Sequence, residues 1–195
     1  MKKSWLFPFL IFGIIACGLG VGIYNQLVKS DEAVKSAWAQ VQNVYQRRLD
    51  LIPNLVETVK GYAAHEKQTL EGVVEARSKI SQMNISADVL NNPEQMAKFQ
   101  ALQTQLSSAL SRLLVVAERY PDLKANQNFL ALQSQLEGTE NRITVERRRF
   151  NEAAQQFNTL IRVFPNNFVA GSSGFREKPY FQADTAAQTA PKVKF

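Results

Sequence analysis

The chain carries no charged residue between Lys3 and Lys29, and this apolar run constrains its structure more than any other feature. The 20 residues from Trp5 to Tyr24 would span about 30 Å as a helix, which matches the hydrocarbon core of a bilayer. Trp5 and Tyr24 stand at its two ends, where amphipathic aromatic side chains favour the membrane interface. The sequence therefore predicts an N-terminal transmembrane helix, with residues 1–28 as the membrane anchor.

Two features of the run leave alternatives open. The residues before Cys17 loosely approximate a lipoprotein signal, so Cys17 is a candidate site of lipidation. The apolar run continues past it to Ile23, which favours an intact anchor instead. Gly18 and Gly22 form a GxxxG pair of the kind that packs two helices together in a membrane, although glycine is also common in single spans.

The charges that flank the run set its predicted orientation. Lys2, Lys3 and the amino terminus precede it, whereas only Lys29 and Lys35 follow closely. Because positively charged flanks stay on the cytoplasmic side, we expect the amino terminus to remain in the cytoplasm and the body of the protein to be exported.

Beyond the anchor, apolar residues recur at spacings of three and four, which indicates amphipathic helices. The first helix continues from the anchor to Ile52. Asp50 and Pro53 predict a turn there, because aspartate caps helices and proline is tolerated only in a first turn. A second helix then carries apolar residues from Val56 to Ile80.

Two longer helices follow a polar stretch. Asn92 and Pro93 predict an N-cap and a first helical position, and Asn126 predicts the cap of a helix that extends to Phe164. Both helices carry apolar residues every seven positions, and no strand-like alternation competes with this pattern. The predicted fold class is all-α: an N-terminal transmembrane helix followed by an elongated antiparallel four-helix bundle over residues 29–164.

Residues 165–195 form a C-terminal extension with a different character, because Pro165 stops the helix. The aromatic residues beyond it follow no period; they are Phe168, Phe175, Tyr180 and Phe181. Two interpretations stay open: these side chains pack back on the bundle, or they form a short docking motif for a partner. The last dozen residues are predicted to be disordered.

The net charge of +6 does not mark a nucleic-acid-binding protein. Lys2 and Lys3 account for +2 and the segment from residue 165 onward for another +2, so the helical body carries only +2. A nucleic-acid-binding domain concentrates its positive charge on the folded body. The single cysteine, Cys17, lies in the anchor, which excludes disulfides and cysteine-based zinc sites from the body.

Four ionisable residues occupy helix seam positions where apolar side chains are expected, namely Arg48, Glu66, Arg77 and Glu146. A charge that is buried alone costs several kcal/mol, so buried charges must be paired. We therefore predict a buried ion-pair network among these residues. A network that fixes the register of the helices is the main interpretation, and a functional pocket is the alternative.

No residue pattern predicts catalysis, a cofactor or a metal ion. The chain has a single histidine, His65, and no Glu-x-x-His motif, so the ligands of a di-iron bundle are missing. It contains no Walker loop, and residues 171–174 do not form a G-x-S-x-G motif. We therefore predict that the protein is not an enzyme and has no catalytic, cofactor-binding or metal-binding residues.

Several motifs resemble the LemA family. The longest is QRRLDLIPNLV at residues 46–56, which ETVKGYA continues at 57–63, and ERYPDLKAN follows at 118–126. Shorter matches lie at residues 24–28, 37–38, 65–66, 75–77, 139–141, 164–165 and 174–175. At Phe150-Asn151 and Phe157-Asn158 the chain departs from the Tyr-Asn that the family often has, so any hydrogen bond of those hydroxyls is lost.

The resemblance implies a bacterial membrane protein with an N-terminal anchor, an elongated helical bundle and no enzymatic activity. We therefore expect a single-pass protein of the bacterial inner (cytoplasmic) membrane. The flanking charges place its body on the periplasmic (extracytoplasmic) side, whereas family descriptions sometimes place the body in the cytosol.

The anchor, the long helices and the missing catalytic signature favour a non-enzymatic scaffold or adaptor. Such a protein would present a helical binding surface to a membrane or envelope protein. The alternative is a self-assembling protein that organises membrane as a homo-oligomer, for which Gly18, Gly22 and the C-terminal aromatic residues are the motivation. The predicted partners are thus inner-membrane lipid and an envelope protein, with no nucleic acid, no metal and no cofactor.

Overall fold

The computed structural model describes residues 6–83 and 86–182, without the side chains of residues 6–10, 12, 15–16 and 87–88. No strand occurs among these residues, so the all-α prediction is confirmed. The helices are α1 (Leu6–Lys60), α2 (Lys67–Ser81), α3 (Pro93–Ala117), α4 (Pro121–Lys124), α5 (Gln127–Arg162) and α6 (Asn166–Ser172), with the 3-10 turn η1 (Ala87–Asn91) before α3.

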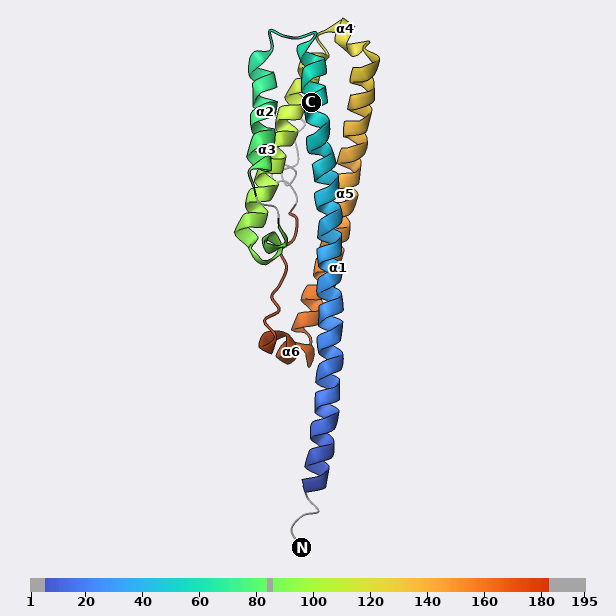
Figure 1. Ribbon diagram of the computed structural model, residues 1–195, viewed down its shortest axis with the longest axis vertical. Coiled ribbons are helices and arrows are strands. Elements are labelled where there is room, and N and C mark those ends of the chain that lie inside the picture. Colours follow the sequence, from blue (N-terminus) through green and yellow to red (C-terminus); the bar gives the residue numbers. More distant parts are fainter. Residues whose placement is uncertain (1–5, 84–85, 183–195) are drawn as a thin grey trace, which may run out of the picture.

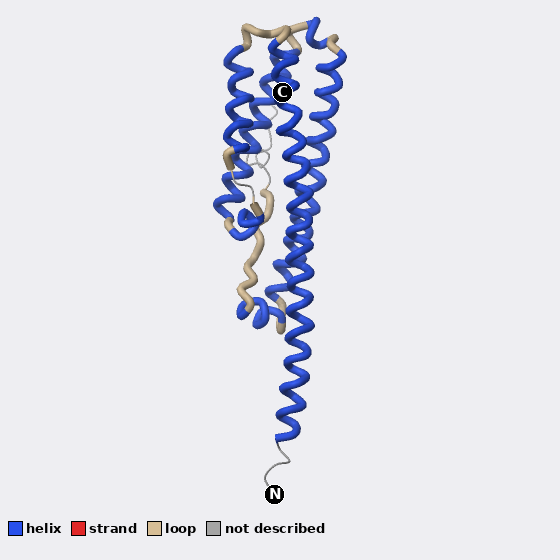
Figure 2. Tube along the Cα trace, viewed as in Figure 1, coloured by secondary structure: helices blue, strands red, loops and turns tan. Residues whose placement is uncertain are grey.

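Two antiparallel helix pairs build the molecule (Figure 1). Helices α1 and α5 form the longer pair, and the shorter pair of α2 and α3 lies beside one end of it, as the tube in Figure 2 also shows. Helix α4 joins α3 to α5 at that end, near the turn between α1 and α2. At the opposite end, α1 extends past α6 without another described helix beside it.

Two clusters of buried apolar side chains hold these helices together, since burial of an amphipathic face supplies most of the stability of a protein helix. The first cluster lies where α1, α2, α3 and α5 meet, and its members include Leu49, Val59, Ile80, Leu113 and Phe129. The second lies mainly between α1 and α5, and its members include Trp38, Phe99, Phe150, Phe157 and Phe181.

The turn predicted at Asp50 and Pro53 is wrong, because α1 continues through the proline. Proline lacks the N–H that would bond to the carbonyl four residues earlier, which here belongs to Leu49. The Nε atom of Arg77 in α2 donates a hydrogen bond to that carbonyl oxygen at 3.0 Å. The helix thus tolerates Pro53 because a neighbouring helix supplies the missing donor, and the turn falls at residues 61–66 instead.

Both predicted N-caps are present. Asn92 precedes α3, and its side-chain oxygen accepts hydrogen bonds from the backbone N–H groups of Glu94 and Gln95 at 3.0 and 3.2 Å. Asn126 precedes α5 and accepts from the N–H of Phe129 at 3.0 Å. These bonds satisfy donors that have no partner inside the helix, which explains why both helices begin where the sequence predicts.

The chain after α5 contains structure that its sequence pattern does not predict. Helix α6 is followed by residues 175–182, which have neither helical nor strand structure and run back along the molecule (Figure 1). We call residues 175–182 the C-terminal strap. The prediction of disorder for the last dozen residues falls on the segment 183–195, which lies outside the described residues.

Of the four aromatic side chains named in this extension, two pack on the bundle and the other two are exposed. Phe181 is buried in the second cluster and Phe175 packs against it, so these two pack back on the bundle. Phe168 and Tyr180 remain exposed on the surface.

Within the described part of the chain, no helix is long and apolar enough to cross a membrane. Trp5, where the predicted span begins, lies outside the described residues. The transmembrane helix therefore stays a prediction. The domain boundaries also stay predictions, and α1 passes without a break through the one expected after residue 28.

Candidate functional site

Arg48 lies in α1 and is only 1% exposed. Its Nη1 donates to Oε1 of Glu140 in α5 at 2.6 Å and to Oγ of Ser107 in α3 at 3.1 Å. Its Nη2 donates to Oε1 of Gln103, also in α3. The guanidinium carbon lies 5.2 Å from the centre of the Tyr45 ring. One buried cation therefore connects three helices, and Glu140 balances its charge.

The structure does not bring the other members of the predicted network to Arg48. Glu146 is buried, but it pairs with Arg149 on the same helix, with Nη1 and Oε1 2.9 Å apart. Arg77 contacts the carbonyl of Leu49, as described above. The predicted single network is therefore not formed, because a seam position specifies the face of a helix and not the height at which a residue meets its neighbours.

Glu66 forms a separate contact at the turn after α1. The Tyr120 hydroxyl donates to its Oε1 at 3.2 Å, and Nη2 of Arg119 lies 3.4 Å from the same oxygen. Burial raises the pKa of Tyr120, as do the charge and the hydrogen bond of Glu66, whereas Arg119 lowers it. This contact ties the α1–α2 turn to the end of α3 and gives no sign of a reactive group.

A groove of about 820 Å³ opens beside Arg48, between α3, α5 and the strap. Two buried nitrogen atoms of its lining residues, Nε of Arg48 and Nε2 of Gln103, have no hydrogen-bond partner among the described residues. Burial raises the pKa of Tyr45, although Arg147 and Arg48 oppose the shift, so its hydroxyl stays protonated at neutral pH. The lining carries charged side chains of both signs, among them Arg48, Glu140 and Lys178, so the groove is suited to binding polar groups.

Metal binding finds no support in the part of the chain that the structure describes. No three side chains of histidine, cysteine, aspartate or glutamate gather there closely enough to hold an ion. The thiol of Cys17 is free and exposed on α1.

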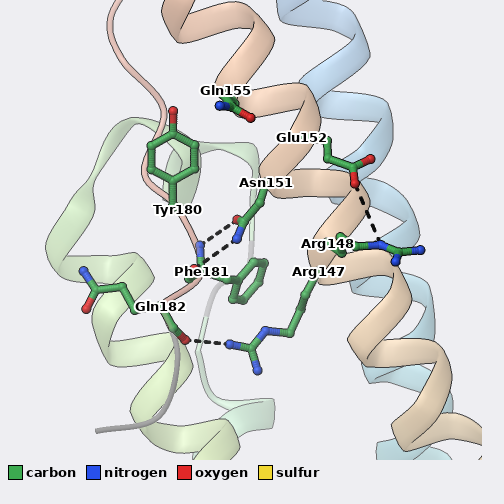
Figure 3. A pocket seen from close by; sticks show the side chains of 8 residues that line it. All are labelled: Arg147, Arg148, Asn151, Glu152, Gln155, Tyr180, Phe181 and Gln182. Atoms are coloured by element: carbon green, nitrogen blue, oxygen red, sulfur yellow. Dashed lines mark hydrogen bonds and ion pairs between the residues drawn. The ribbon is translucent and has the colours of Figure 1, made fainter. Parts of the chain in front are cut away.

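Two asparagines of α5 hold the strap by its backbone. Asn158 donates to the Lys178 carbonyl at 2.9 Å and accepts from the Lys178 N–H at 2.7 Å. Asn151 does the same for Phe181, at 3.0 and 2.9 Å, and Figure 3 shows both of these bonds. From the other side, Gln100 of α3 accepts from the Gln182 N–H at 3.0 Å. We call Asn151 and Asn158 the asparagine clamps.

The spacing of the clamps matches the spacing of the residues they hold. Seven helical residues rise about 10.5 Å, and three extended residues cover about 10 Å. Asn151 and Asn158 are two turns apart on one face of α5, so they meet two backbone positions that are three residues apart. Only a strap that is nearly fully extended satisfies both clamps.

The strap also places two side chains in pockets of different chemistry. The Phe181 ring lies 6.0 Å from that of Trp38 and 5.5 Å from that of Phe150, and the guanidinium of Arg147 lies 4.7 Å from its centre. The Lys178 side chain is buried, with its Nζ 2.9 Å from an oxygen of Asp31 in α1.

A second contact completes the lysine pocket. Nζ of Lys178 donates to Oδ1 of Asn91 in η1 at 2.9 Å, and it lies 5.3 Å from the centre of the Phe157 ring. One pocket is thus acidic and polar, and the other is aromatic.

A comparison with protein families covers the residues of this site. A model of the LemA family matches residues 37–195, which include Arg48, both asparagine clamps and the strap. The chain belongs to the LemA family. The resemblance found in its motifs is therefore confirmed.

Relatives of this LemA-family chain come from several bacteria. Protein LemA of Metamycoplasma hominis is 29% identical over 181 residues, which cover 91% of this chain and 78% of that protein. Magnetosome protein MamQ 2 of Paramagnetospirillum magneticum is 26% identical over 182 residues, which cover 85% of this chain and 67% of that protein. Magnetosome protein MamQ of Magnetospirillum gryphiswaldense is 24% identical, with the same coverage.

Sequence reasoning about this LemA-family chain missed the clamps. It noted Phe150-Asn151 and Phe157-Asn158 only for tyrosine hydroxyls that are absent, whereas the asparagines contact the strap. A signal was present: the Phe-Asn pair recurs after seven residues, which places both asparagines on one face beside the apolar seam. The backbone groups that these asparagines bind lie 20 to 30 residues further along the chain, in a segment whose sequence shows no periodic pattern.

We expect the LemA-family protein to lose stability in acid through Asp31. Its burial raises the pKa, but hydrogen bonds from Lys35 and Lys178, together with their charges, outweigh this and hold the pKa below its usual value of 3.8. A lowered pKa in the folded state stabilises the fold above the unfolded value, and this contribution is lost as the pH falls through the folded value. The free energy of unfolding should therefore drop below about pH 4 in part through Asp31.

Urea titrations between pH 2 and 7 test this expectation, with Asp31→Asn as the variant. Asp31→Asn should be less stable than wild type at neutral pH and should lose less stability on acidification. Glu71→Gln, which removes an exposed carboxylate near Lys67, is the control and should follow the wild-type profile. Parallel profiles for wild type and Asp31→Asn would contradict the assignment.

Proposed function

We propose that this LemA-family protein is a membrane-tethered, non-enzymatic adaptor that presents the groove between α3 and α5 to an envelope protein. The observation that carries the proposal is the pair of buried, unpartnered nitrogen atoms of Arg48 and Gln103 beside an open groove. Buried donors without acceptors are costly, so they mark a place where a ligand's oxygen atoms would be stabilised. The relatives' names link two of them to the magnetosome and none to a reaction.

The proposal includes the N-terminal anchor. Large apolar side chains near the start of α1 are exposed, among them Ile14 and Leu19 at 64% each, whereas from Leu27 onward the same helix buries one apolar face. An apolar surface of this kind requires a partner, and lipid of the inner membrane is the one proposed. The flanking charges favour a body outside the cytoplasm. Lipidation of the exposed Cys17 is the alternative tether, and palmitate labelling that Cys17→Ser abolishes would establish it.

Site-specific crosslinking in intact membranes tests the adaptor role. A photoreactive amino acid at Ala101, an exposed position on the rim of the groove, should trap the same envelope protein in repeated experiments. Val115 is the matched control, because it is also exposed on α3 and does not line the groove. Crosslinks that are identical from both positions, or that join only copies of this chain, would contradict the proposal.

Self-assembly is the second candidate function. Gly18 and Gly22 lie one turn apart on α1, and a Cβ atom built on either would meet nothing within 4 Å, so this face is open for close helix contact. Light scattering of the detergent-solubilised chain should then show an oligomer that Gly18→Leu dissociates. A monomer at all concentrations would dismiss this candidate.

A further inference from the structure

The contacts of the strap are those by which a protein binds an extended peptide. Four hydrogen bonds from the asparagine clamps go to the backbone N–H and carbonyl groups of Lys178 and Phe181, so they do not depend on which side chains the peptide carries. Recognition of an extended segment by backbone hydrogen bonds, with pockets for selected side chains, is a recurring mode of peptide binding.

The two pockets select the side chains. Asp31 and Asn91 surround a primary amine and compensate its charge, whereas Trp38 and Phe150 receive an aromatic ring. Because the clamps fix a spacing of three residues, the site recognises a lysine followed three positions later by a phenylalanine. Of the two residues between them, Pro179 is half-buried and Tyr180 is 41% exposed, although its hydroxyl accepts a hydrogen bond from Nδ2 of Asn158 at 3.0 Å.

The strap fills only part of the space that is available to it. A hollow of about 600 Å³ lies along its α5 side, where Arg147, Asn151 and Gln155 face Tyr180 and Gln182 (Figure 3). The groove of about 820 Å³ beside Arg48 lies on its other side. Arg147, Tyr180 and Gln182 line both hollows, so the strap runs between them. We call the place of the strap between α3 and α5, together with the two hollows, the trough.

We propose that this trough is a peptide-binding site whose ligand is an extended Lys-x-x-Phe segment of a protein partner, and that the C-terminal strap occupies it as an internal competitor. The inference rests on the proposed adaptor role and gives the chemistry of the segment that the partner contributes. The partner's lysine takes the place of Lys178 beside Asp31, and its aromatic ring takes the place of Phe181 beside Trp38.

Competition within one chain sets the affinity that is expected. A segment tethered by a short linker acts at a local concentration of about millimolar, so the wild-type chain should bind a matching peptide weakly. A strap that has lost its aromatic anchor should compete poorly. Removing the internal competitor should therefore raise the apparent affinity for an external peptide without any change in the clamps.

Fluorescence anisotropy on the full-length chain in detergent tests this, with a fluorescein-labelled peptide of residues 175–182 as the probe. Phe181→Ala in the chain should bind the probe at least tenfold more tightly than wild type. Adding Asn151→Ala should remove that gain, whereas Asn141→Ala, an exposed asparagine on the same helix away from the strap, should not. A probe with alanine at the lysine position and at the second phenylalanine position should not bind.

Hydrogen exchange on the wild-type chain gives a second measurement that needs no variant. Excess unlabelled peptide should speed exchange of the Lys178 and Phe181 amides, because the strap leaves its clamps. A Phe181→Ala chain that keeps its helical circular dichroism but does not bind, or strap amides that are unaffected by saturating peptide, would overturn the proposal. Dimers that depend on Asn151 would also overturn it, since the ligand would then be the strap of a second copy.

The two proposals fail in different ways. If the peptide binds but Ala101 traps no envelope protein, the trough is a peptide site and the adaptor role is wrong. If Ala101 traps a partner and the peptide does not bind, the adaptor role stands and the partner is recognised elsewhere along the groove.

Discussion

Replacing Trp38 with alanine is expected to lower the free energy of unfolding by about 4 kcal/mol. Trp38 is 1% exposed and its ring lies within 6.0 Å of the rings of Phe99, Phe150 and Phe181. These partners belong to α3, α5 and the strap, so the cavity left by the indole cannot close by moving one element. Urea denaturation of the full-length chain in detergent, followed by far-ultraviolet circular dichroism, measures the loss.

Trp38→Phe is the matched control for this prediction. The indole nitrogen of Trp38 is buried without a hydrogen-bond partner, so phenylalanine gives up volume and no hydrogen bond. We expect a loss of about 1 kcal/mol. A loss below about 1 kcal/mol for Trp38→Ala would show that the second cluster does not unfold with the rest of the molecule. Equal losses for the two variants would contradict the expected dependence on the volume removed.

Removing Glu140 while Arg48 remains is expected to lower the free energy of unfolding by about 2 kcal/mol. Glu140→Ala leaves a guanidinium whose side chain is 2% exposed with only neutral partners, Ser107 and Gln103. Removing one partner of a fully buried ion pair costs roughly 3–5 kcal/mol. A smaller loss is expected here because the Glu140 side chain is 40% exposed, so solvent screens its attraction to Arg48.

A paired substitution separates the charge from the packing. Arg48→Met combined with Glu140→Gln removes both charges and keeps similar volumes, so it should lie within about 1 kcal/mol of wild type. Glu137→Ala is the control and should change little, because this exposed carboxylate on the same helix accepts a hydrogen bond from the neutral Gln133. A double variant as unstable as Glu140→Ala would mean that Arg48 acts through its shape and not through its charge.

Local signals account for the parts of the fold that the sequence predicts. The caps at Asn92 and Asn126 are formed by residues next to the helices they start, and the seven-residue steps of α3 and α5 lie within those helices. The all-α class and the start of both helices follow from them. The end predicted at Phe164 lies only two residues beyond the observed end of α5.

The parts that the sequence does not predict depend on contacts between distant residues. Pro53 ordinarily predicts a turn, but here Arg77 of the next helix supplies the missing donor. Arg48 is correctly placed on a buried seam, but its partner Glu140 is 92 residues away and is one of several acidic residues with similar spacing. The sequence of the strap shows no periodic pattern, because side chains of α5 hold its backbone in place.

The continuity of α1 has a geometric consequence for a tethered molecule. The helix runs from Leu6 to Lys60 in one piece, so there is no joint at which the body swings relative to the segment that ends at Tyr24. With that segment in the bilayer, Asp31 of the lysine pocket would stand 7 residues further along the rod, or about 10 Å above the lipid surface, and Arg48 would stand 24 residues further, or about 36 Å. Every copy would then hold its trough at the same height along α1, and a partner in the same membrane would reach the lysine pocket with a segment that rises about 10 Å from the lipid.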